Sequence, residues 1–237
     1  MRKKKHSEER LFECKEYILP SPTEPMKNPA KEVFSADGKP VFLEIGAGKG
    51  GFACGMVKAH PEVCYFAMER VTDCVVIAAE GAKKSGCVDN LRFILDTADN
   101  LTRIFEVGTV DEIFLNFSDP WPKKGYAKRR LTHKRYLSVY LNLLKDGGRL
   151  TFKTDNLPLF EFSLEEIEAV GITPDRLTRD LHQSEYNEGN VVTEYEAAFS
   201  SRGVKINMVS FVKPDGFAIE VPDNLKKDRK DYRREND

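Results

Sequence analysis

The residues best suited to chemistry begin with a glycine-rich run, LEIGAGKGG, at positions 43–51. Glycine tolerates positive φ and lets a ligand lie against bare backbone, and the start of a following helix offers unpaired N–H groups to negative charge. The phosphate loop of NTPases needs Ser or Thr after Gly-Lys to bind magnesium, whereas Gly50 follows Lys49 here. The spacing therefore excludes that loop. It fits both the dinucleotide pattern G-x-G-x-x-G and the tighter G-x-G-x-G of S-adenosylmethionine enzymes.

Three acidic residues discriminate between these two cofactors. Glu69 ends a predicted strand nineteen residues after Gly50, where a carboxylate can bind both hydroxyls of a ribose. Glu44, two residues before Gly46, would repel a pyrophosphate but suits the ammonium and sulfonium charges of S-adenosylmethionine. Asp96 follows the next strand and is placed to accept a hydrogen bond from an adenine amino group, although helix capping or turn formation is its alternative role. The predicted S-adenosylmethionine contacts are Glu44, Gly46, Gly48, Glu69, Asp96 and Asp119.

A stiff and strongly basic loop follows the fourth predicted strand. It has the sequence SDPWPKKGYAKRRLT at positions 118–132 and holds two prolines and the only tryptophan of the chain. From Asp119 to Arg135 there are seven Lys or Arg residues and one acid, a local net charge of +6, so the other 220 residues carry −7 of the total of −1. Cations at a helix N-terminus oppose its dipole, so the placement has no stability benefit. It predicts a polyanionic substrate, with a solvated helix start as the alternative.

The elements that must position these residues alternate between strand and helix. Predicted parallel strands, recognisable as continuous apolar runs, cover residues 41–45, 65–68, 91–95, 113–117 and 149–152. Predicted helices cover residues 51–60, 72–85, 98–105 and 132–144, the last ended by the Asp146-Gly147-Gly148 turn. Residues 205–213 alternate in polarity and are expected to form an antiparallel edge strand. The pattern predicts an α/β, doubly wound, mostly parallel sheet that binds ligands at the carboxyl ends of its strands.

Composition limits the function classes and the domain organisation. No apolar run approaches the ~20 residues of a membrane helix, and five cysteines without a Cys-x-x-Cys pair and four scattered histidines offer no zinc framework. The basic start is followed by Ser7-Glu8-Glu9-Arg10 where a signal peptide needs an apolar stretch. We therefore expect a cytoplasmic protein that binds neither membrane nor metal. The predicted parts are a basic, proline-containing extension (1–35), a catalytic domain (36–216) and a charged tail (217–237), with both ends solvated.

Five motifs together resemble a known family. LEIGAGKG, Glu69, SDPWPKK–KRRLT, FKTDN (152–156) and TEYE (193–196) resemble the bacterial tRNA (guanine-N7-)-methyltransferases of the TrmB type, in matching order over residues 40–213. The resemblance implies a Rossmann-like methyltransferase fold and transfer of a methyl group from S-adenosylmethionine to a guanine in the tRNA variable loop, position 46 in tRNA numbering. The chain departs from the family at Gly125-Tyr126, where basic and histidine residues are usual, and in a longer tail beyond Gly216.

The resemblance also implies roles for individual residues. Guanine N7 has a lone pair and no proton to lose, so no general base is needed, and Asp119 is the expected catalytic residue, accepting hydrogen bonds from guanine beside the cofactor. Lys123 is expected to hold a phosphate or the rim of the base. The other expected substrate contacts are Asp155, Thr193, Glu194 and Glu196. The expected RNA-backbone contacts are Lys124, Lys128, Arg129 and Arg130.

Several alternatives stay open from the sequence. Asp155-Asn156 could cap a helix, Thr193–Glu196 fits a Ser/Thr-x-x-Glu capping box, and Tyr195 is assigned to packing. Asp119-Pro120 would also suit a methyltransferase that acts on exocyclic amines. The spacing of the glycines would also suit an NAD-dependent oxidoreductase, and the basic loop would also suit a non-catalytic RNA-binding protein. The choice of tRNA and the choice between monomer and homodimer are left undecided.

Overall fold

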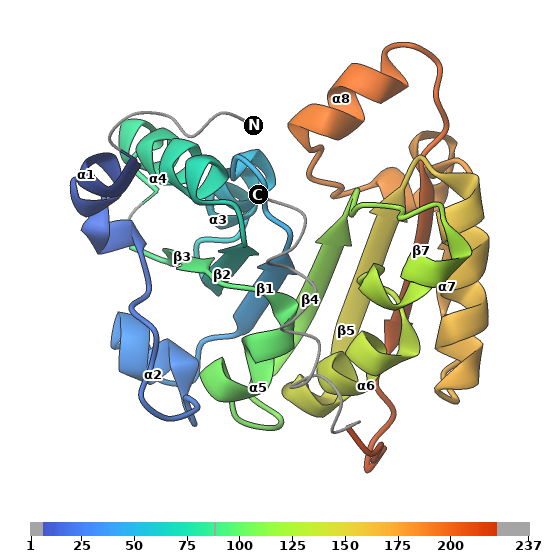
Figure 1. The fold of residues 1–237 in the computed structure, drawn as a ribbon, viewed down its shortest axis with the longest axis horizontal. Helices are drawn as coiled ribbons and strands as arrows, with labels where there is room; N and C mark the ends of the chain where they lie inside the picture. The colour runs from blue at the N-terminus through green and yellow to red at the C-terminus, as the bar shows by residue number, and fades with distance from the viewer. Residues whose placement is uncertain (1–6, 88, 222–237) are drawn as a thin grey trace.

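A seven-stranded sheet forms the centre of the computed structural model, which describes residues 7–87 and 89–221 (Figure 1). The strand order is β3-β2-β1-β4-β5-β7-β6. The strands are β1 (Val41–Ile45), β2 (Cys64–Glu69), β3 (Leu91–Leu95), β4 (Val110–Asn116), β5 (Leu144–Thr154), β6 (Arg176–Thr178) and β7 (Asn207–Val212). The helices are α1 (Ser7–Phe12), α2 (Pro29–Phe34), α3 (Gly51–Ala59), α4 (Thr72–Ser85), α5 (Leu101–Ile104), α6 (Lys134–Leu143), α7 (Leu157–Ala169) and α8 (Glu194–Ser200).

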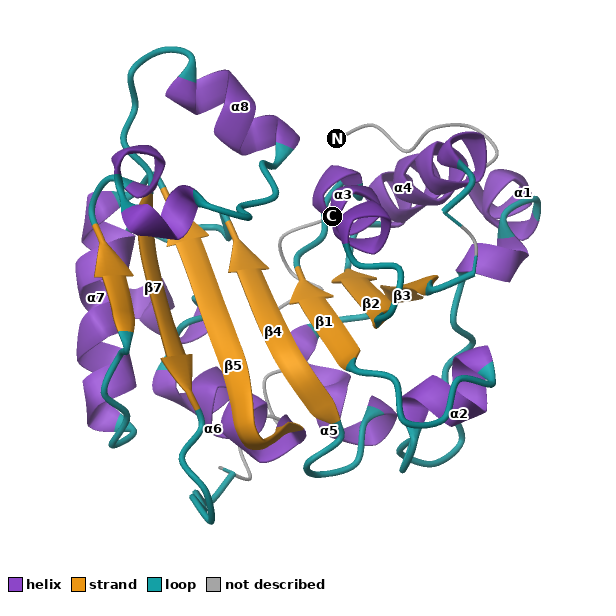
Figure 2. Cartoon of the chain, turned by 180° about the vertical axis from the view of Figure 1, so that it is seen from behind, coloured by secondary structure: helices purple, strands orange, loops and turns teal. Residues whose placement is uncertain are grey.

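Helices cover both faces of this sheet. Successive strand residues point to opposite faces, and the apolar side chains on each face pack against helices. On one face, Leu43 and Phe66 belong to a core cluster with residues of α2, α5, α6 and α7. On the other face, Tyr65 and Phe93 belong to a second cluster with α3 and α4. α8 stands above the carboxyl ends of β4 and β5 (Figure 2). The chain order reverses between β1 and β4, and this is the point at which doubly wound sheets bind ligands.

The predicted fold class is confirmed, with differences in two places. β1 to β5 are parallel and β7 is antiparallel to β5. However, β7 is not the edge strand, because the short β6 pairs with its free side. Moreover, α6 ends at Leu143 and β5 begins at the next residue, so the Asp146-Gly147-Gly148 turn lies within β5 as an irregularity. A Cβ at Gly148 would lie 2.8 Å from a backbone oxygen, so only glycine fits there.

The N-terminal extension differs most from expectation. Over its described part the prediction of a solvated segment is wrong, since Tyr17 and Met26 are buried. The backbone N–H of Leu19 donates to the carbonyl of Phe93, and that of Met26 donates to the carbonyl of Ile104. The extension therefore covers the otherwise open edge at β3, a common protection of sheet edges. Residues 20–30, expected to be extended, lead into α2, which Asn28 caps by accepting from the N–H of Lys31.

The charged tail is described only at its start. Phe217, Ile219 and Val221 are partly buried against the first core cluster, so this beginning is packed. The residues from 222 onward, on which most of the tail prediction depends, lie outside the described part of the chain.

Candidate active site

Two adjoining cavities lie at the carboxyl edge of the sheet. The first, of about 310 Å³, is lined by Glu69, Asp96 and Asp119 among other residues. The second, of about 380 Å³, lies between the glycine loop and the start of α8. Gly46 and Phe117 line both cavities, so the two cavities are direct neighbours at the carboxyl edge of the sheet. The structure therefore gathers residues from four strand ends and from α8, which are far apart in the sequence.

The glycine loop needs glycine for conformational reasons. Gly46, Gly48 and Gly50 have φ values of 86°, 55° and 76°, a region that strains residues with a Cβ. A Cβ at Gly50 would also lie 2.8 Å from the Cβ of Ala78 on α4. The loop thus packs tightly against α4, and Gly51 and Phe52 at the start of α3 line the second cavity.

Glu69 and Asp96 line the first cavity and also fix its walls. Glu69 accepts hydrogen bonds from the N–H of Gly48 through Oε2 (3.0 Å) and from the N–H of Arg70 and Val71 through Oε1 (2.8 and 2.9 Å). Asp96 Oδ1 accepts from the N–H of Thr97 (2.7 Å) and from the amide of Asn100 (2.6 Å). Asp96 therefore both stabilises the turn that follows β3 and lines the cavity.

Glu44 has an unusual environment for a carboxylate. It is 2 % exposed and lines the second cavity, and its Oε1 accepts from the Asn116 amide at 3.2 Å. Among the described residues, Oε2 has no hydrogen-bond partner, since the hydroxyl of Tyr65, which faces this carboxylate, misses hydrogen-bond geometry. Burial raises the pKa of Glu44 to about 7, although Asn116 and the nearby Lys153 oppose the shift. A cation entering the cavity would satisfy this oxygen and favour the charged form.

Asp119 lies at the mouth of the first cavity. Its side chain is 67 % exposed and Oδ2 lies 3.3 Å from the guanidinium of Arg70, which lines the same cavity. Phe117 (φ 51°) and Trp121 (φ 40°) are non-glycine residues in left-handed conformations on either side of it. Such strain at neighbouring positions is typical of functional loops.

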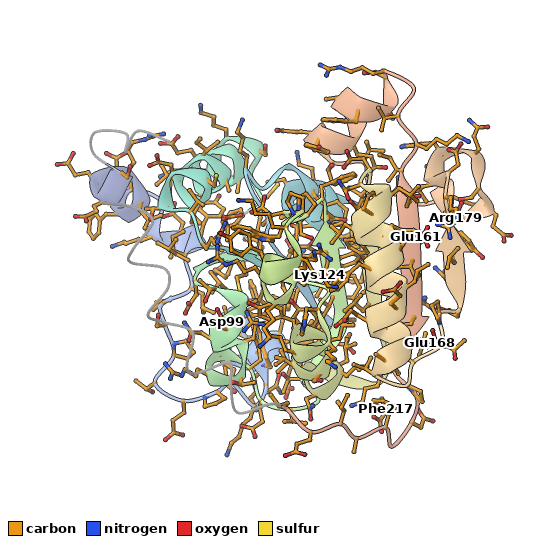
Figure 3. All side chains as sticks on the ribbon, turned by 45° about the vertical axis from the view of Figure 1, so that its right-hand side comes forward. Asp99, Lys124, Glu161, Glu168, Arg179 and Phe217 are labelled. Carbon is orange, nitrogen blue, oxygen red and sulfur yellow. The ribbon has the colours of Figure 1, made fainter. Side chains whose placement is uncertain are left out.

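The basic loop divides into a supporting part and an exposed part. Arg130 donates to the carbonyls of Pro120 (3.0 Å) and Trp121 (3.1 Å), so it holds the loop instead of pointing outward to RNA as predicted. Arg129 lies over the rings of Trp121 and Tyr126, with 5.0 and 4.5 Å to the centroids, and lines the first cavity. Tyr126, one of the two residues at which the loop departs from the family, thus packs against the guanidinium of Arg129. The exposed cations of the loop are Lys123, Lys124 (labelled in Figure 3) and Lys128.

The start of α8 forms the outer wall of the second cavity, lined there by Thr193, Glu194 and Tyr195. Thr193 caps the helix by accepting from the N–H of Glu196 at 2.8 Å. The Glu194 carboxylate lies beside Gly51, at the start of α3. The ring of Tyr195 packs on Phe117, with centroids 4.9 Å apart, as its assignment to packing predicts. The same residue also lines the cavity.

Two predicted substrate contacts are placed elsewhere. Glu196 is fully buried and does not line the cavity; its Oε2 pairs with Lys153 at 2.8 Å. The predicted substrate contact for Glu196 is therefore wrong for this arrangement. The capping box is only half formed, because its Glu side chain turns to Lys153. Asp155 lies near Tyr195, where it adds to the rise in the pKa of that phenol caused mainly by burial, and it is Asn156 that caps α7.

Sequence reasoning missed several residues that this site uses. Arg70, Asn116 and Lys153 were assigned no role. Arg70 follows Glu69 on an exposed turn and gives no pattern of its own. Lys153, in contrast, interrupts an apolar strand run, and a lysine at such a position needs a buried partner. That signal was available in the sequence.

The described residues add two observations on other function classes. No helix within 7–87 and 89–221 is long and apolar enough to cross a membrane. In the same part of the chain, no three His, Cys, Asp or Glu residues gather into a group that could hold a metal ion.

Comparisons with known proteins agree with this site. A family model described as a putative methyltransferase matches residues 38–209. A tRNA (guanine-N(7)-)-methyltransferase of Bacillus cytotoxicus is 41 % identical over 209 residues, 88 % of this chain and 94 % of that protein. Two solved structures share the fold. The 16S rRNA methyltransferase KamB has a TM-score of 0.60 and 13 % sequence identity, and the match covers 83 % of this chain and 98 % of that one. An antibiotic-related methyltransferase has a TM-score of 0.58 and 16 % sequence identity, and the match covers 82 % of this chain and 99 % of that one. The chain belongs to the tRNA (guanine-N7-)-methyltransferase family.

Proposed function

We propose that this protein transfers the methyl group of S-adenosylmethionine to N7 of a guanine in the variable loop of tRNA, at position 46 in standard tRNA numbering. The observation that carries the proposal is the single site in which Asp119 shares a cavity with Glu69 and Asp96, beside the buried carboxylate of Glu44. The activity of the 41 % identical relative supports the same conclusion. tRNA is then the partner, and the cytoplasm is the expected location.

The donor set of the site fits S-adenosylmethionine. Glu69 would hold the ribose hydroxyls, Asp96 the adenine amino group, and the unpartnered oxygen of Glu44 the ammonium of the methionine part. Gly46 and Gly48 would let the cofactor lie against the backbone. When bound, S-adenosylmethionine supplies an electrophilic methyl group on a sulfonium.

The residues of the chain then bind and orient the guanine. N7 attacks through a lone pair and loses no proton, so alignment does the catalytic work, and ideal positioning can contribute ~7–11 kcal/mol. Positive charge develops on the purine as the methyl group arrives, and the carboxylate of Asp119 stabilises it. Asp119 accepts from N1–H and the exocyclic amine of guanine. Arg70 lies 3.3 Å from Oδ2 of Asp119, and the two oxygens of this carboxylate have acceptor sites left for the guanine.

The exposed cations fit the approach of the RNA. Lys123, Lys124 and Lys128 lie on the loop that bears Asp119, so a phosphate backbone bound there brings its bases to the cavity mouth. The target base has to leave its stack, which costs a few kcal/mol. Thr193 and Glu194, which line the second cavity, are the proposed contacts that hold the base on the side of α8. Residues 36–216 are the proposed catalytic domain.

Unmodified tRNA incubated with methyl-labelled S-adenosylmethionine tests the proposal. We expect 7-methylguanosine on nucleoside analysis, located in the variable loop, and no product from a tRNA whose variable-loop guanine is replaced by adenosine. A methyl group on an exocyclic amine would establish the alternative methyltransferase. Binding of both tRNA and cofactor without any methylated nucleoside would favour a non-catalytic RNA-binding protein and end the proposal.

A further inference from the structure

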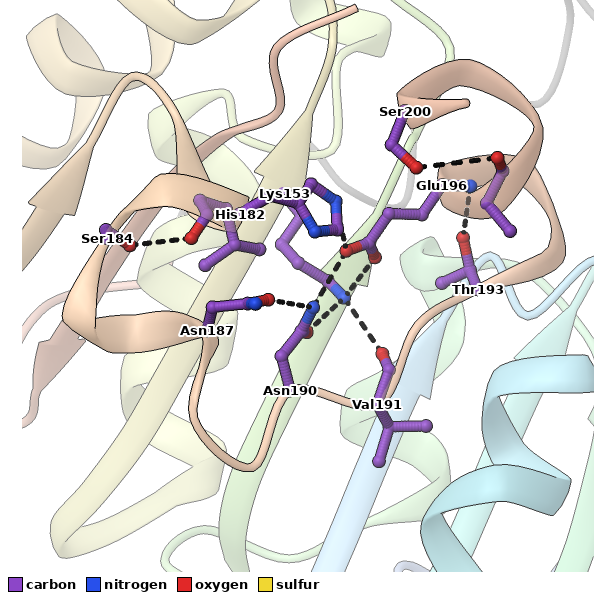
Figure 4. Close-up of polar contacts among 11 residues, drawn as sticks. Lys153, His182, Ser184, Asn187, Asn190, Val191, Thr193, Glu196 and Ser200 are labelled. Atoms are coloured by element: carbon purple, nitrogen blue, oxygen red, sulfur yellow. Dashed lines mark hydrogen bonds and ion pairs between the residues drawn. The ribbon is translucent and has the colours of Figure 1, made fainter. Parts of the chain in front are cut away.

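A buried lysine holds the segment that leads into α8 (Figure 4). Lys153 lies in β5, 3 % exposed, and its Nζ donates three hydrogen bonds to that segment. The acceptors are Oε2 of Glu196 (2.8 Å), Oδ1 of Asn190 (3.1 Å) and the carbonyl oxygen of Val191 (3.2 Å). All three donor hydrogens of the ammonium are thus used on one short stretch of chain.

The carboxylate of Glu196 completes the same network. It is fully buried, and its Oε1 accepts from the Asn190 amide at 2.8 Å and lies 3.2 Å from Nε2 of His182. Asn190 therefore bridges the lysine and the glutamate, accepting from one and donating to the other. Both oxygens of the buried carboxylate are engaged, as a buried charge requires.

Stability alone is a weak reason for such a network. A buried ion pair is often no more stabilising than well-packed apolar side chains of similar volume. Its benefit is geometric, because charged partners with fixed hydrogen-bond directions accept one arrangement only. The question is therefore which part of the molecule this arrangement positions.

The network lies directly behind the wall of the second cavity. Thr193, Glu194 and Tyr195 line that cavity between Val191 and Glu196, two of the three residues that Lys153 binds. The wall also fits closely against α3, since a Cβ at Gly55 would lie 2.7 Å from the side chain of Val191. A lateral shift of the segment would therefore change the distance from Glu194 to the glycine loop.

We propose that Lys153 is a positioning residue for methyl transfer, which fixes residues 190–196 against the sheet so that Thr193, Glu194 and Tyr195 form the substrate wall. Lys153 touches neither substrate nor cofactor in this role. The inference rests on the proposed function for the part that concerns tRNA. The anchoring itself is a property of the free protein, and the burial that lowers the pKa of Lys153 is opposed by Glu196, in keeping with a charged pair.

The first test removes both charges together. Lys153→Met with Glu196→Leu replaces the pair by apolar residues of similar volume, which is expected to fold with nearly the wild-type melting temperature. We expect hydrogen–deuterium exchange of residues 191–200 to become faster. With saturating S-adenosylmethionine, kcat/KM for tRNA should fall by tenfold to about a hundredfold, since a misplacement of ~1 Å has such effects. A folded double variant with unchanged exchange, or with unchanged kcat/KM, would overturn the proposal.

A milder variant decides the matter if the double variant does not fold. Asn190→Ala removes the bridge but leaves the Lys153–Glu196 pair, and Asn187→Ala, an exposed neighbour 3.5 Å from Asn190, is its matched control. We expect faster exchange and a several-fold lower kcat/KM for tRNA in the first variant only. Equal behaviour of the two variants refutes the anchor. Faster exchange in Asn190→Ala, combined with a wild-type protein that forms no 7-methylguanosine, would retain the anchor and reject the proposed function.

Discussion

The buried carboxylate of Glu44 makes cofactor binding depend on pH. Burial raises its pKa from the ordinary value of 4.5 to about 7, a difference that corresponds to about 3 kcal/mol between the two protonation states. The ammonium of S-adenosylmethionine needs the ionised form. Because the apparent affinity is reduced by the fraction of competent protein, lowering the pH from 7.5 to 5.5 should weaken binding by about 25-fold. The ammonium of the ligand, with an α-amino pKa of ~7.7, is fully protonated at pH 5.5 but only about three-fifths protonated at pH 7.5. This opposing titration reduces the expected net difference to about 15-fold.

The same titration affects stability in the opposite direction. The folded protein keeps a proton that the unfolded chain has released, so the contribution of Glu44 to the free energy of unfolding is fully present below pH 4.5. It is lost as the pH rises through about 7. Glu44→Gln removes this loss. Relative to wild type, the variant should be more stable above pH 7, by up to about 3 kcal/mol, while it binds the cofactor weakly and without the wild-type loss of affinity at low pH.

Isothermal titration calorimetry of S-adenosylmethionine at several pH values, with urea unfolding at each, measures both effects. Glu112 is a matched control, since burial raises its pKa to about 7 as well, yet it does not line either cavity of the site. Glu112→Gln should change the pH dependence of stability and leave that of cofactor binding as in wild type. Wild-type binding that is constant from pH 5.5 to 7.5, or Glu44→Gln binding that retains the pH dependence, would refute the assignment.

Four further predictions concern the basic loop and the start of α3. Asp119→Asn should lower kcat for tRNA by about 100-fold in a methyl-transfer assay while filter binding of tRNA persists; equal losses would make Asp119 a binding residue only. Lys124→Ala and Lys128→Ala should each reduce the salt dependence of tRNA binding by ~0.7–0.9 per phosphate contact, and an unchanged slope would remove them from the interface. Arg130→Ala should lower the melting temperature instead, because it frees two loop carbonyls. Gly50→Ala, at a φ of 76°, should cost about 1–3 kcal/mol in urea unfolding; a wild-type midpoint would contradict the strain.

The features that local sequence specifies were predicted well. Apolar runs marked β1 to β4 and the end of β5 because buried parallel strands are hydrophobic on both faces. α4 has the predicted bounds, Thr72 to Ser85. The glycine loop and the acids at the strand ends follow from the same logic, since parallel strands bring their carboxyl ends to one edge of the sheet. Glu69, Asp96 and Asp119 could therefore be assigned to one site before any contact between them was known.

The sequence by itself thus determined which elements form, how they are ordered and which strand ends meet. Only the tertiary structure decided where individual charged side chains point. Glu196 turns to Lys153, forty-three residues away in the chain, and Arg130 turns inward to the carbonyls of its own loop. The physical reason is that strand and helix patterns arise from neighbours along the chain, whereas a long charged side chain can reach several partners. Burial and the demand for hydrogen bonds across the fold select among those partners.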